Sequence, residues 1–599
     1  MSFKVIPVLF YLFSPLIFAQ AIYVTADRIK TKESEATAKI IIINQEQIKN
    51  THSDQLVDVL KQNANLDIIK SGPNGSTSSI FIRGTEASHT LVILDGVVLN
   101  DPSNPSRQFD LSKLNASNLE RVEIITGPQS ILYGSNAIGG AIILTSKSGI
   151  SRDSIAIQID SHNSLSTKFN QSNQFNDHDI NWGLYTNYSD GYSASKDSNR
   201  LNDKDGNKSY GLNFSIMSKV KQNSRYGFTT RFQKENMDLD KGGGPGTDDH
   251  NYSSHTQEIF SKLFYEKFWS DSLSSKFNYG YVNQFRKSID GLDNYQSYSD
   301  NSSYRGVSHQ ISVENTIVFS ENFTLDVNLG NTQETAERKS LNNAFLAWYS
   351  KYSLNQNTFN FGARLDYFET FKEHLTYKLG YSRDFDRFQI RSSFSTGFKA
   401  PSINQLYATN VGNKELKPEE SRSIDLGLDL TFAIHQLSFT TFYNHISNRL
   451  SYDPARNYLN INSGSAMTKG IEFGFRTFIN SYFTDSINYN LTEAIDLKTK
   501  KRLPRRAENQ ITHRLSYEND NHKINFENQF KSGRADINNS NQSVQLKKFA
   551  IMNIYYDYTF KENLAINGSI KNIFKSDYQE IWGYNNGGRI LALGINYKF

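Results

Sequence analysis

Cysteine is absent from this 599-residue sequence. Its absence excludes thiol catalysis, disulfide bonds and cysteine-ligated zinc, but it does not fix the cellular compartment. The sequence also lacks a large excess of positive or negative charge, because its formal net charge is only +4. This small net charge argues against a nucleic-acid-binding protein. The sequence contains none of the motifs G-x-S-x-G, H-E-x-x-H, G-x-x-x-x-G-K-S/T or G-x-G-x-x-G, so we expect a protein that is not an enzyme.

Long hydrophobic runs are rare as well, and the one that stands out is N-terminal. Lys4 precedes a mostly apolar run over Ile6–Phe18, and Ala19-Gln20-Ala21 then resembles a signal cleavage site. The run is too short to span a bilayer, so residues 1–19 are interpreted as a secretory signal peptide, with a buried N-terminal helix as the alternative. No other stretch is long and apolar enough to cross a bilayer as a helix. We therefore expect an exported protein in which any membrane span is a β-strand.

Aromatic residues, in contrast, are abundant. They make up 13% of the chain although its mean hydropathy is -0.57, and they are interleaved with Asn, Ser, Asp and Lys. Residues 29–149 have a different pattern, that of a compact α/β domain in which Gly and Pro separate short apolar segments. A helix is expected over Asp54–Leu60, and strands are expected over Ile40–Ile43, Ile80–Ile82, Leu91–Leu94, Val122–Ile125 and Ala141–Thr145.

From residue 150 to residue 599 the pattern changes to an alternation of apolar and polar residues. In Leu591–Phe599 the odd positions are Leu, Leu, Ile, Tyr and Phe, and the even positions are small or polar. Met552–Phe560 alternates in the same way and continues through a turn at 561–563 into Leu564–Ile570, which predicts a hairpin. Such alternation, with Tyr and Phe near the segment ends, is typical of a transmembrane β-barrel; a soluble β-sandwich or propeller is the alternative.

The length of this second region predicts the size of the barrel. At roughly 20 residues for a strand and its connection, residues 150–599 allow about 22 antiparallel strands, the size class of plugged outer-membrane transporters. A barrel of that size encloses a lumen wide enough to leak. We therefore predict a transmembrane β-barrel of about 22 antiparallel strands, with the N-terminal α/β domain inside the lumen as a plug.

Several motifs in a fixed order together cover nearly the whole mature chain. They are Ser78–Gly84, Leu91–Gly96, Leu119–Pro128, Leu132–Gly140, Thr396–Ser402, Leu416–Ser421, Lys571–Phe574 and the final Phe599. These motifs resemble those of the TonB-dependent outer-membrane receptor family. Within that family, Ser78–His89, Arg505–Ala507 and Gly583–Arg589 are most similar to the vitamin B12 (cobalamin) receptors.

The resemblance implies TonB-dependent active uptake of a corrinoid across the outer membrane of a Gram-negative bacterium, with a ferric siderophore or haem as the alternative ligand. It also implies that TonB, with its inner-membrane energising complex, and outer-membrane lipids are partners. A passive porin or an adhesin is disfavoured because neither would need a plug or a TonB box.

A TonB box, which pairs as a strand with TonB, is expected within residues 20–28. The alternative is that these are merely the first residues of the mature chain. The residues that resemble the box are Ile22, Tyr23, Val24, Thr25 and Ala26.

Ligand binding is expected at plug loops in the outer mouth of the barrel. Segments 71–79 and 100–106 are rich in Gly, Pro, Ser and Asn, and they match plug loops that contact cobalamin in the family. Ordinary turn chemistry is the alternative role for each residue, and Asp101 and Glu86 depart from the residues expected in that family. The resemblance places near the ligand Thr77, Ser79, Glu86, Asn104, Pro105 and Arg505.

Two acidic segments, 202–207 and 238–249, raise the question of a cation site. Segment 202–207 begins like an EF-hand loop, but its Gly is one place early and no Glu follows at the twelfth position, so it is not an EF-hand. The cobalamin receptors have calcium-ordered loops, and the resemblance implies a structural calcium ion here, with a solvated hairpin turn as the alternative. No cofactor is expected to be required. The implied calcium ligands are Asp203, Asp205, Asp240 and Asp248.

Three charged residues, Arg83, Arg121 and Glu123, lie in or beside the expected plug strands. Such buried charges need partners. We expect them to pair either with polar residues of the barrel wall or with one another inside the plug.

Overall fold

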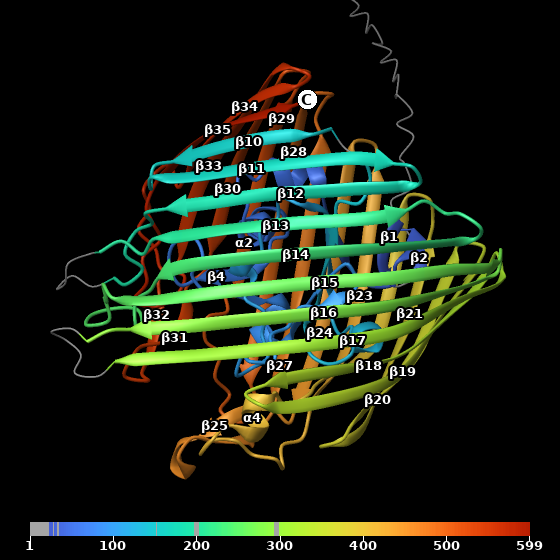
Figure 1. The fold of residues 1–599 in the computed structure, drawn as a ribbon, viewed down its shortest axis with the longest axis horizontal. Helices are drawn as coiled ribbons and strands as arrows, with labels where there is room; N and C mark the ends of the chain where they lie inside the picture. Colours follow the sequence, from blue (N-terminus) through green and yellow to red (C-terminus); the bar gives the residue numbers. More distant parts are fainter. Residues whose placement is uncertain (1–22, 28, 33–34, 151, 197–202, 293–298) are drawn as a thin grey trace, which may run out of the picture.

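A closed barrel of antiparallel strands surrounds a small α/β domain (Figure 1). The computed structural model describes residues 23–27, 29–32, 35–150, 152–196, 203–292 and 299–599, so the expected signal peptide and Ile22 lie outside the described residues. The barrel has 22 strands and closes where its last strand, β35, pairs antiparallel with its first, β10. The predicted fold class is confirmed.

The barrel strands follow one another around the wall in chain order. Two hairpins lie in connections and take no part in the wall: β25 (Leu450–Asp453) with β26 (Leu459–Asn462), and β31 (Arg534–Ile537) with β32 (Ser543–Leu546). The wall strands are β10 (Ser154–Asp160), β11 (Ser164–Phe175), β12 (His178–Ser189), β13 (Asn207–Ser218), β14 (Ser224–Asp238), β15 (Tyr252–Ser270), β16 (Leu273–Asp290), β17 (Asp300–Ser320), β18 (Phe323–Ala336), β19 (Lys339–Leu354), β20 (Asn357–Phe368), β21 (Lys372–Asp384), β22 (Phe388–Lys399), β23 (Glu419–Phe432), β24 (His435–Ser447), β27 (Ala466–Phe478), β28 (Phe483–Asp496), β29 (Asn509–Glu518), β30 (His522–Lys531), β33 (Phe549–Lys561), β34 (Leu564–Lys571) and β35 (Ile590–Lys598).

The last strand shows why these segments form a membrane-spanning wall. In β35 the side chains of Leu593 and Ile595 are 62% and 54% exposed, whereas Ala592 is 8% exposed. Successive residues of a strand point to opposite faces, so apolar side chains cover the outside and small or polar ones face the lumen. The predicted hairpin is present as β33 and β34, joined at residues 562–563.

The two ends of the barrel have connections of different length. At one end the strands are joined by tight turns such as 176–177, 271–272 and 321–322. In outer-membrane barrels short turns face the periplasm and long loops face the outside. The outer end is therefore the one at the lower left of Figure 1, with β31 and β32 at the left and α4 and β25 at the bottom; β1 (Tyr23–Asp27) and β2 (Ile29–Lys32) lie at the opposite end. The elements in the outer loops are α4 (Ile403–Tyr407), β25 (Leu450–Asp453), β26 (Leu459–Asn462), β31 (Arg534–Ile537) and β32 (Ser543–Leu546).

The plug is built on a five-stranded sheet with the strand order β3-β8-β9-β6-β7, in which β6 and β9 are parallel. Its aliphatic residues form one core with α2, and Phe260 and Val282 of the barrel wall pack into the same core. No helix in the described part of the chain has the length and apolarity of a membrane span. The main plug elements are β3 (Ile40–Asn44), α1 (Gln45–Lys49), α2 (Leu56–Asn63), β4 (Asp67–Lys70), β5 (Ser78–Phe81), β6 (Thr90–Leu94), β7 (Val97–Val98), β8 (Leu119–Thr126), α3 (Ser130–Tyr133) and β9 (Gly140–Ser146).

The segment around Arg83 differs from the expected strand over Ile80–Ile82. Strand β5 ends at Phe81, and the chain then turns through Ile82–Gly84 with Arg83 at a φ of 52°. Strand β5 pairs with β4, whereas β6 pairs with β7 and β9, so the two neighbouring apolar runs do not form a hairpin. Positive φ is unfavourable for a residue with a side chain, and here it accompanies two ion pairs from Arg83 to the barrel wall.

Buried ion pairs join the plug to the wall. The Arg83 guanidinium contacts Asp425 of β23 and Glu472 of β27, with 3.1 Å between Nε and Glu472 Oε1. Arg121 instead pairs with Glu123 inside the plug, at 2.8 Å. Both expected kinds of partner are therefore present. Other plug-to-wall pairs are Arg107–Glu334, Lys113–Glu235, Asp67–Lys531 and His89–Glu419, and Lys61 pairs with Glu580 in the connection between β34 and β35.

A barrel of this size without its plug should conduct ions. We expect a variant lacking residues 20–148 to form large, persistent channels in planar bilayers, because nothing else in the described chain fills the lumen. Single-channel current is the measurement, with the full-length protein as the control. Equal conductance from both proteins would contradict the lumen-filling role.

Candidate ligand-binding mouth

Two plug loops form the floor of the outer mouth. Segment 71–77 joins β4 to β5, and segment 99–110 follows β7. They are tied together because Asp110 accepts a hydrogen bond from the Ser78 N–H at 3.1 Å and Gln108 Nε2 donates to the Ser78 carbonyl at 3.2 Å. Thr77 at the rim of the first loop is exposed and Ser79 is half-buried. Both remain predicted ligand contacts.

The second loop, segment 99–110, contains the ordinary turn interactions that were the alternative to ligand contact. Asn104 Oδ1 accepts hydrogen bonds from the backbone N–H and the hydroxyl of Ser106, both at 3.0 Å, so the Asn104 side chain caps its own turn. Pro105 is exposed, and its carbonyl accepts a hydrogen bond from the Ser402 hydroxyl in the outer loop 400–418. The loop is thereby tied to outer loop 400–418, and Pro105 is the one exposed residue of segment 99–110.

Glu86 lies between the plug and two outer loops. Its Oε1 is 3.1 Å from Arg449 Nη2 in loop 448–465, and its Oε2 is 2.8 Å from Arg506 Nη2 in loop 497–508. Burial alone would raise the pKa of Glu86, but the two guanidinium groups outweigh it and lower the pKa to about 2. Glu86 is therefore a charged tie between plug and mouth. Its expected role at the ligand stays a prediction.

The arginines that hold Glu86 were not among the predicted site residues. Arg506 adjoins the predicted Arg505, which itself turns to Asp536 of β31 with 2.7 Å between Nε and Oδ1. Nothing in the sequence around Arg449 signals a role, because its partner is distant in the chain. The resemblance included the segment Arg505–Ala507, but it did not indicate that the Arg506 guanidinium contacts the plug; Arg505 as a ligand contact stays a prediction.

Loop 497–508 brings a local excess of positive charge to the outer end of the barrel. Glu508 is its one acidic residue and pairs with Arg502 at 2.7 Å. Lys498, Lys500 and Lys501 are exposed. A concentration of one charge at the rim of a cavity attracts ligands of the opposite charge. The basic residues of the loop are Lys498, Lys500, Lys501, Arg502, Arg505 and Arg506.

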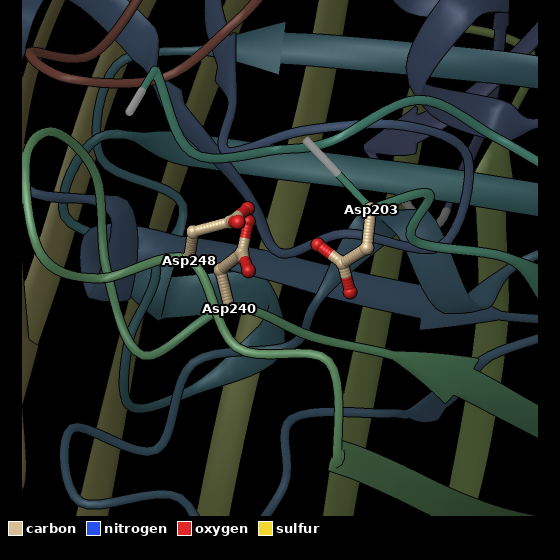
Figure 2. Close-up of side chains that lie close together, drawn as sticks. All are labelled: Asp203, Asp240 and Asp248. Carbon is tan, nitrogen blue, oxygen red and sulfur yellow. The ribbon is translucent and has the colours of Figure 1, made fainter. Parts of the chain in front are cut away.

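The four predicted cation ligands come together beside the mouth. Carboxylate oxygens of Asp203, Asp240 and Asp248 all lie within 4.8 Å of one another, and Figure 2 shows these side chains converging from two loops. Asp205 is completely buried next to them, and its Oδ2 accepts a hydrogen bond from the Ala194 N–H at 2.6 Å. The structure therefore brings the predicted residues to one place; ion binding there remains a prediction.

The electrostatics of this acidic cluster fit a bound cation. Burial and the charge of Asp240 raise the pKa of Asp205 to about 9, and burial and Asp248 raise the pKa of Asp203 to about 6. Oδ1 of Asp203 and Oδ1 of Asp205 are buried without a hydrogen-bond partner. Calcium takes six to eight oxygen ligands, mostly carboxylates and carbonyls. The donor set therefore suits a hard cation such as calcium, which would neutralise the cluster and join the two loops.

A 22-strand barrel with a polar lumen, an N-terminal plug and a loop-built outer mouth defines a plugged outer-membrane transporter. The chain belongs to the TonB-dependent receptor family. Residues 151–573 match the family described as "TonB dependent receptor-like, beta-barrel", and residues 32–141 match the "TonB-dependent Receptor Plug Domain". It is accordingly a multi-strand outer-membrane protein of Gram-negative bacteria, from a family of transporters and receptors that work with TonB, and not an enzyme family.

Solved structures share this fold across almost their whole length. The siderophore receptor PirA from Acinetobacter baumannii is 16% identical, with a TM-score of 0.80 over 94% of this chain and 98% of that one. The FrpB iron transporter from Neisseria meningitidis is 14% identical, with a TM-score of 0.82 over 94% and 100%. A variant of the ferric enterobactin receptor PfeA from Pseudomonas aeruginosa is 15% identical, with a TM-score of 0.83 over 96% and 100%. At these identities the likeness establishes the fold.

Calcium binding to the acidic cluster should release protons. Without a cation the raised pKa values keep Asp205, and in part Asp203, protonated near neutral pH, so calcium must displace these protons. Affinity should therefore rise from pH 5.5 to pH 8.5, by about tenfold per pH unit for each proton released. Isothermal titration in buffers of different ionisation enthalpy measures both the affinity and the protons released.

The control is Asp271→Asn, in a periplasmic turn, which should bind calcium as the parent does. Asp205→Asn should weaken calcium binding at every pH. Affinity independent of pH, or unchanged in Asp205→Asn, would show that the cluster is not a calcium site.

Proposed function

We propose that this receptor imports an anionic ferric siderophore by TonB-driven transport. The observation that carries the ligand assignment is the positive charge of loop 497–508 above the mouth. Ferric complexes of catecholate siderophores are large anions, and such a rim would attract them and hold them over the plug. The names of the structural neighbours, which include siderophore receptors, support the same ligand class. Haem is also an anion because of its propionates, so the positive loop would attract it too. No separate observation favours haem over a ferric siderophore.

A corrinoid is the second candidate, and it rests on a different observation. The acidic cluster of Asp203, Asp205, Asp240 and Asp248 occupies loops where the resemblance to cobalamin receptors implies calcium. The run Ser78–His89, which carries that resemblance, places Glu86 at the mouth. Ligand charge separates the two candidates, because cobalamin lacks the multiple negative charges of a ferric tricatecholate.

The proposed energy input is through the TonB box. Tyr23–Asp27 form β1, which pairs antiparallel with β2 (Ile29–Lys32) in a sheet of two strands at the periplasmic end. A two-stranded sheet leaves each strand one open edge, so β1 is available for addition of a strand from TonB. This geometry supports the box at Tyr23, Val24, Thr25 and Ala26; Ile22 lies outside the described residues.

The polar plug–wall interface supports a transport step in which the plug moves. A pull on the N-terminal segment must break ion pairs such as Arg83–Glu472 and Lys113–Glu235. Water can solvate the separated charges as the interface opens, so the gap does not have to stay dry. Ligand held above the plug would then enter a hydrated path to the periplasm.

Val24→Pro should uncouple binding from uptake. Proline removes a main-chain donor and fixes φ near −65°, which should prevent strand addition. Surface binding should stay within about twofold of the parent, because the box lies at the periplasmic end, while energised uptake should fall to background. Labelled ligand counted on and inside cells separates the two steps. Val24→Ala, which keeps the N–H, is the control and should transport normally; uptake by Val24→Pro at the parental rate would show that the box is misassigned.

Ligand charge should determine affinity. Replacing Lys498, Lys500 and Lys501 with Ser should weaken binding of ferric enterobactin by about two- to fivefold for each lysine at low salt. Equilibrium binding to purified protein is the measurement, and Lys219→Ser in a periplasmic turn is the control. If cyanocobalamin binds and ferric siderophores do not, the corrinoid candidate replaces the siderophore while TonB-driven import is retained.

A further inference from the structure

Four basic side chains form a patch on the outside of the barrel wall. They are Lys208 of β13, Lys234 of β14, Lys287 of β16 and Arg305 of β17. Each has the same place in the alternation as exposed apolar residues of its own strand: Leu212, Tyr226, Phe277 and Ile311 respectively. The four side chains therefore leave the wall on its lipid side, and we call them the outer cationic patch.

The strand register places the patch in two adjacent rows. Neighbouring strands lie about 4.8 Å apart, so the patch spans about 19 Å from β13 to β17, and the rows are about 7 Å apart. Polar donors and acceptors separate the charges within each row. The row nearer the outer end is Lys208, Asn236, His255, Lys287 and Ser303, and the row below it is Tyr210, Lys234, Gln257, Phe285 and Arg305.

The patch lies at the outer edge of the apolar band. Leu212 and Ile259 are exposed on the lipid side immediately below the second row, on strands of the same wall segment. Tyr210 and Phe285 stand within that row, where aromatic side chains mark the membrane interface. All four cations lie near the ends of their strands that lead into the long outer loops. They are therefore at the level of the headgroups of the outer leaflet.

The four cations have no ion-pair partner among the acidic side chains of the described residues. Arg305 Nε donates to Asn283 at 3.1 Å, and Lys208 Nζ lies 5.4 Å from the Tyr188 ring centroid. Carboxylates lie only at the edge of the patch: Asp238 is two residues beyond Asn236 on β14, Asp190 accepts a hydrogen bond from the Tyr188 hydroxyl, and the register places Glu337 beside Arg305.

By contrast, Lys469 of β27, which also faces outward at this end of the barrel, forms an ion pair with Glu493 at 2.9 Å. An unbalanced cluster at headgroup depth is expected to attract an anionic lipid.

We propose that the outer cationic patch binds the phosphate groups of an anionic glycolipid in the outer leaflet. Lys and Arg can extend their charged ends into the headgroup layer while their aliphatic stems remain on the apolar wall. Two rows of cations match a headgroup with more than one phosphate, and Asn236, Gln257 and Ser303 supply hydrogen-bonding groups for its sugars. This site is separate from the mouth and does not depend on the identity of the imported ligand.

The test uses the full-length receptor in detergent, titrated with bis-phosphorylated lipid A and followed by native mass spectrometry. The double variant Lys234→Ser/Arg305→Ser should bind lipid A about 25-fold more weakly, at roughly fivefold per cation. The variant lacking all four cations should lose specific binding. The matched control, Arg422→Ser/Lys469→Ser, removes two outward cations elsewhere at the same end and should change affinity less than threefold.

Two further arms identify what is recognised. Lipid A stripped of its phosphates should bind as weakly to the parent protein as intact lipid A binds to the double variant. Millimolar inorganic phosphate should not displace lipid A, whereas displacement would assign the patch to free phosphate and overturn the lipid assignment. Equal binding by the parent and the double variant, in protein whose barrel is shown to be folded by heat-modifiable electrophoretic mobility, would overturn the site itself.

Discussion

The polar lumen is the constraint on which the rest of the structure depends. Every second side chain of a wall strand points outward, and many of these are apolar. The side chains between them point into the lumen, and many of these are polar or charged. A plug inside such a wall cannot be held by hydrophobic packing alone, and charged groups that it buries need partners. Arg83 meets two wall carboxylates, and Glu86 meets two loop guanidinium groups. The plug is therefore held by contacts that water can replace.

The same barrel separates its charges by location. Loop 497–508 is positive over the mouth, the acidic cluster beside it brings several carboxyl groups together, and the outer cationic patch faces the lipid. Burial and mutual repulsion make the acidic cluster hold protons unless a cation replaces them. The first two regions lie in outer connections at the mouth, whereas the outer cationic patch lies on the lipid side of the wall.

The barrel could be predicted from the sequence because alternation is a local property. Leu591–Phe599 reveals its two faces within nine residues, and the observed β35 matches them. The convergence of the acidic residues also followed from the resemblance, because it located both loops. The pairing of β5 could not be predicted, because an apolar run of four residues does not specify its partner. Arg449 was missed for a related reason: its contact with Glu86 joins segments far apart in the chain.

The position of β3 has a mechanical consequence. It is the first strand of the plug sheet after the N-terminal segment, it lies at the edge, and within the sheet it pairs only with β8. A force applied at the N-terminus therefore loads one ladder, from Ile40–Ile125 to Asn44–Arg121, before it reaches the parallel pair β6–β9. The plug sheet can lose this strand and keep four others paired. Under load, β3 would separate first from β8 at the edge of the sheet. The four remaining strands would stay paired, and β3 could pair with β8 again when the load is removed.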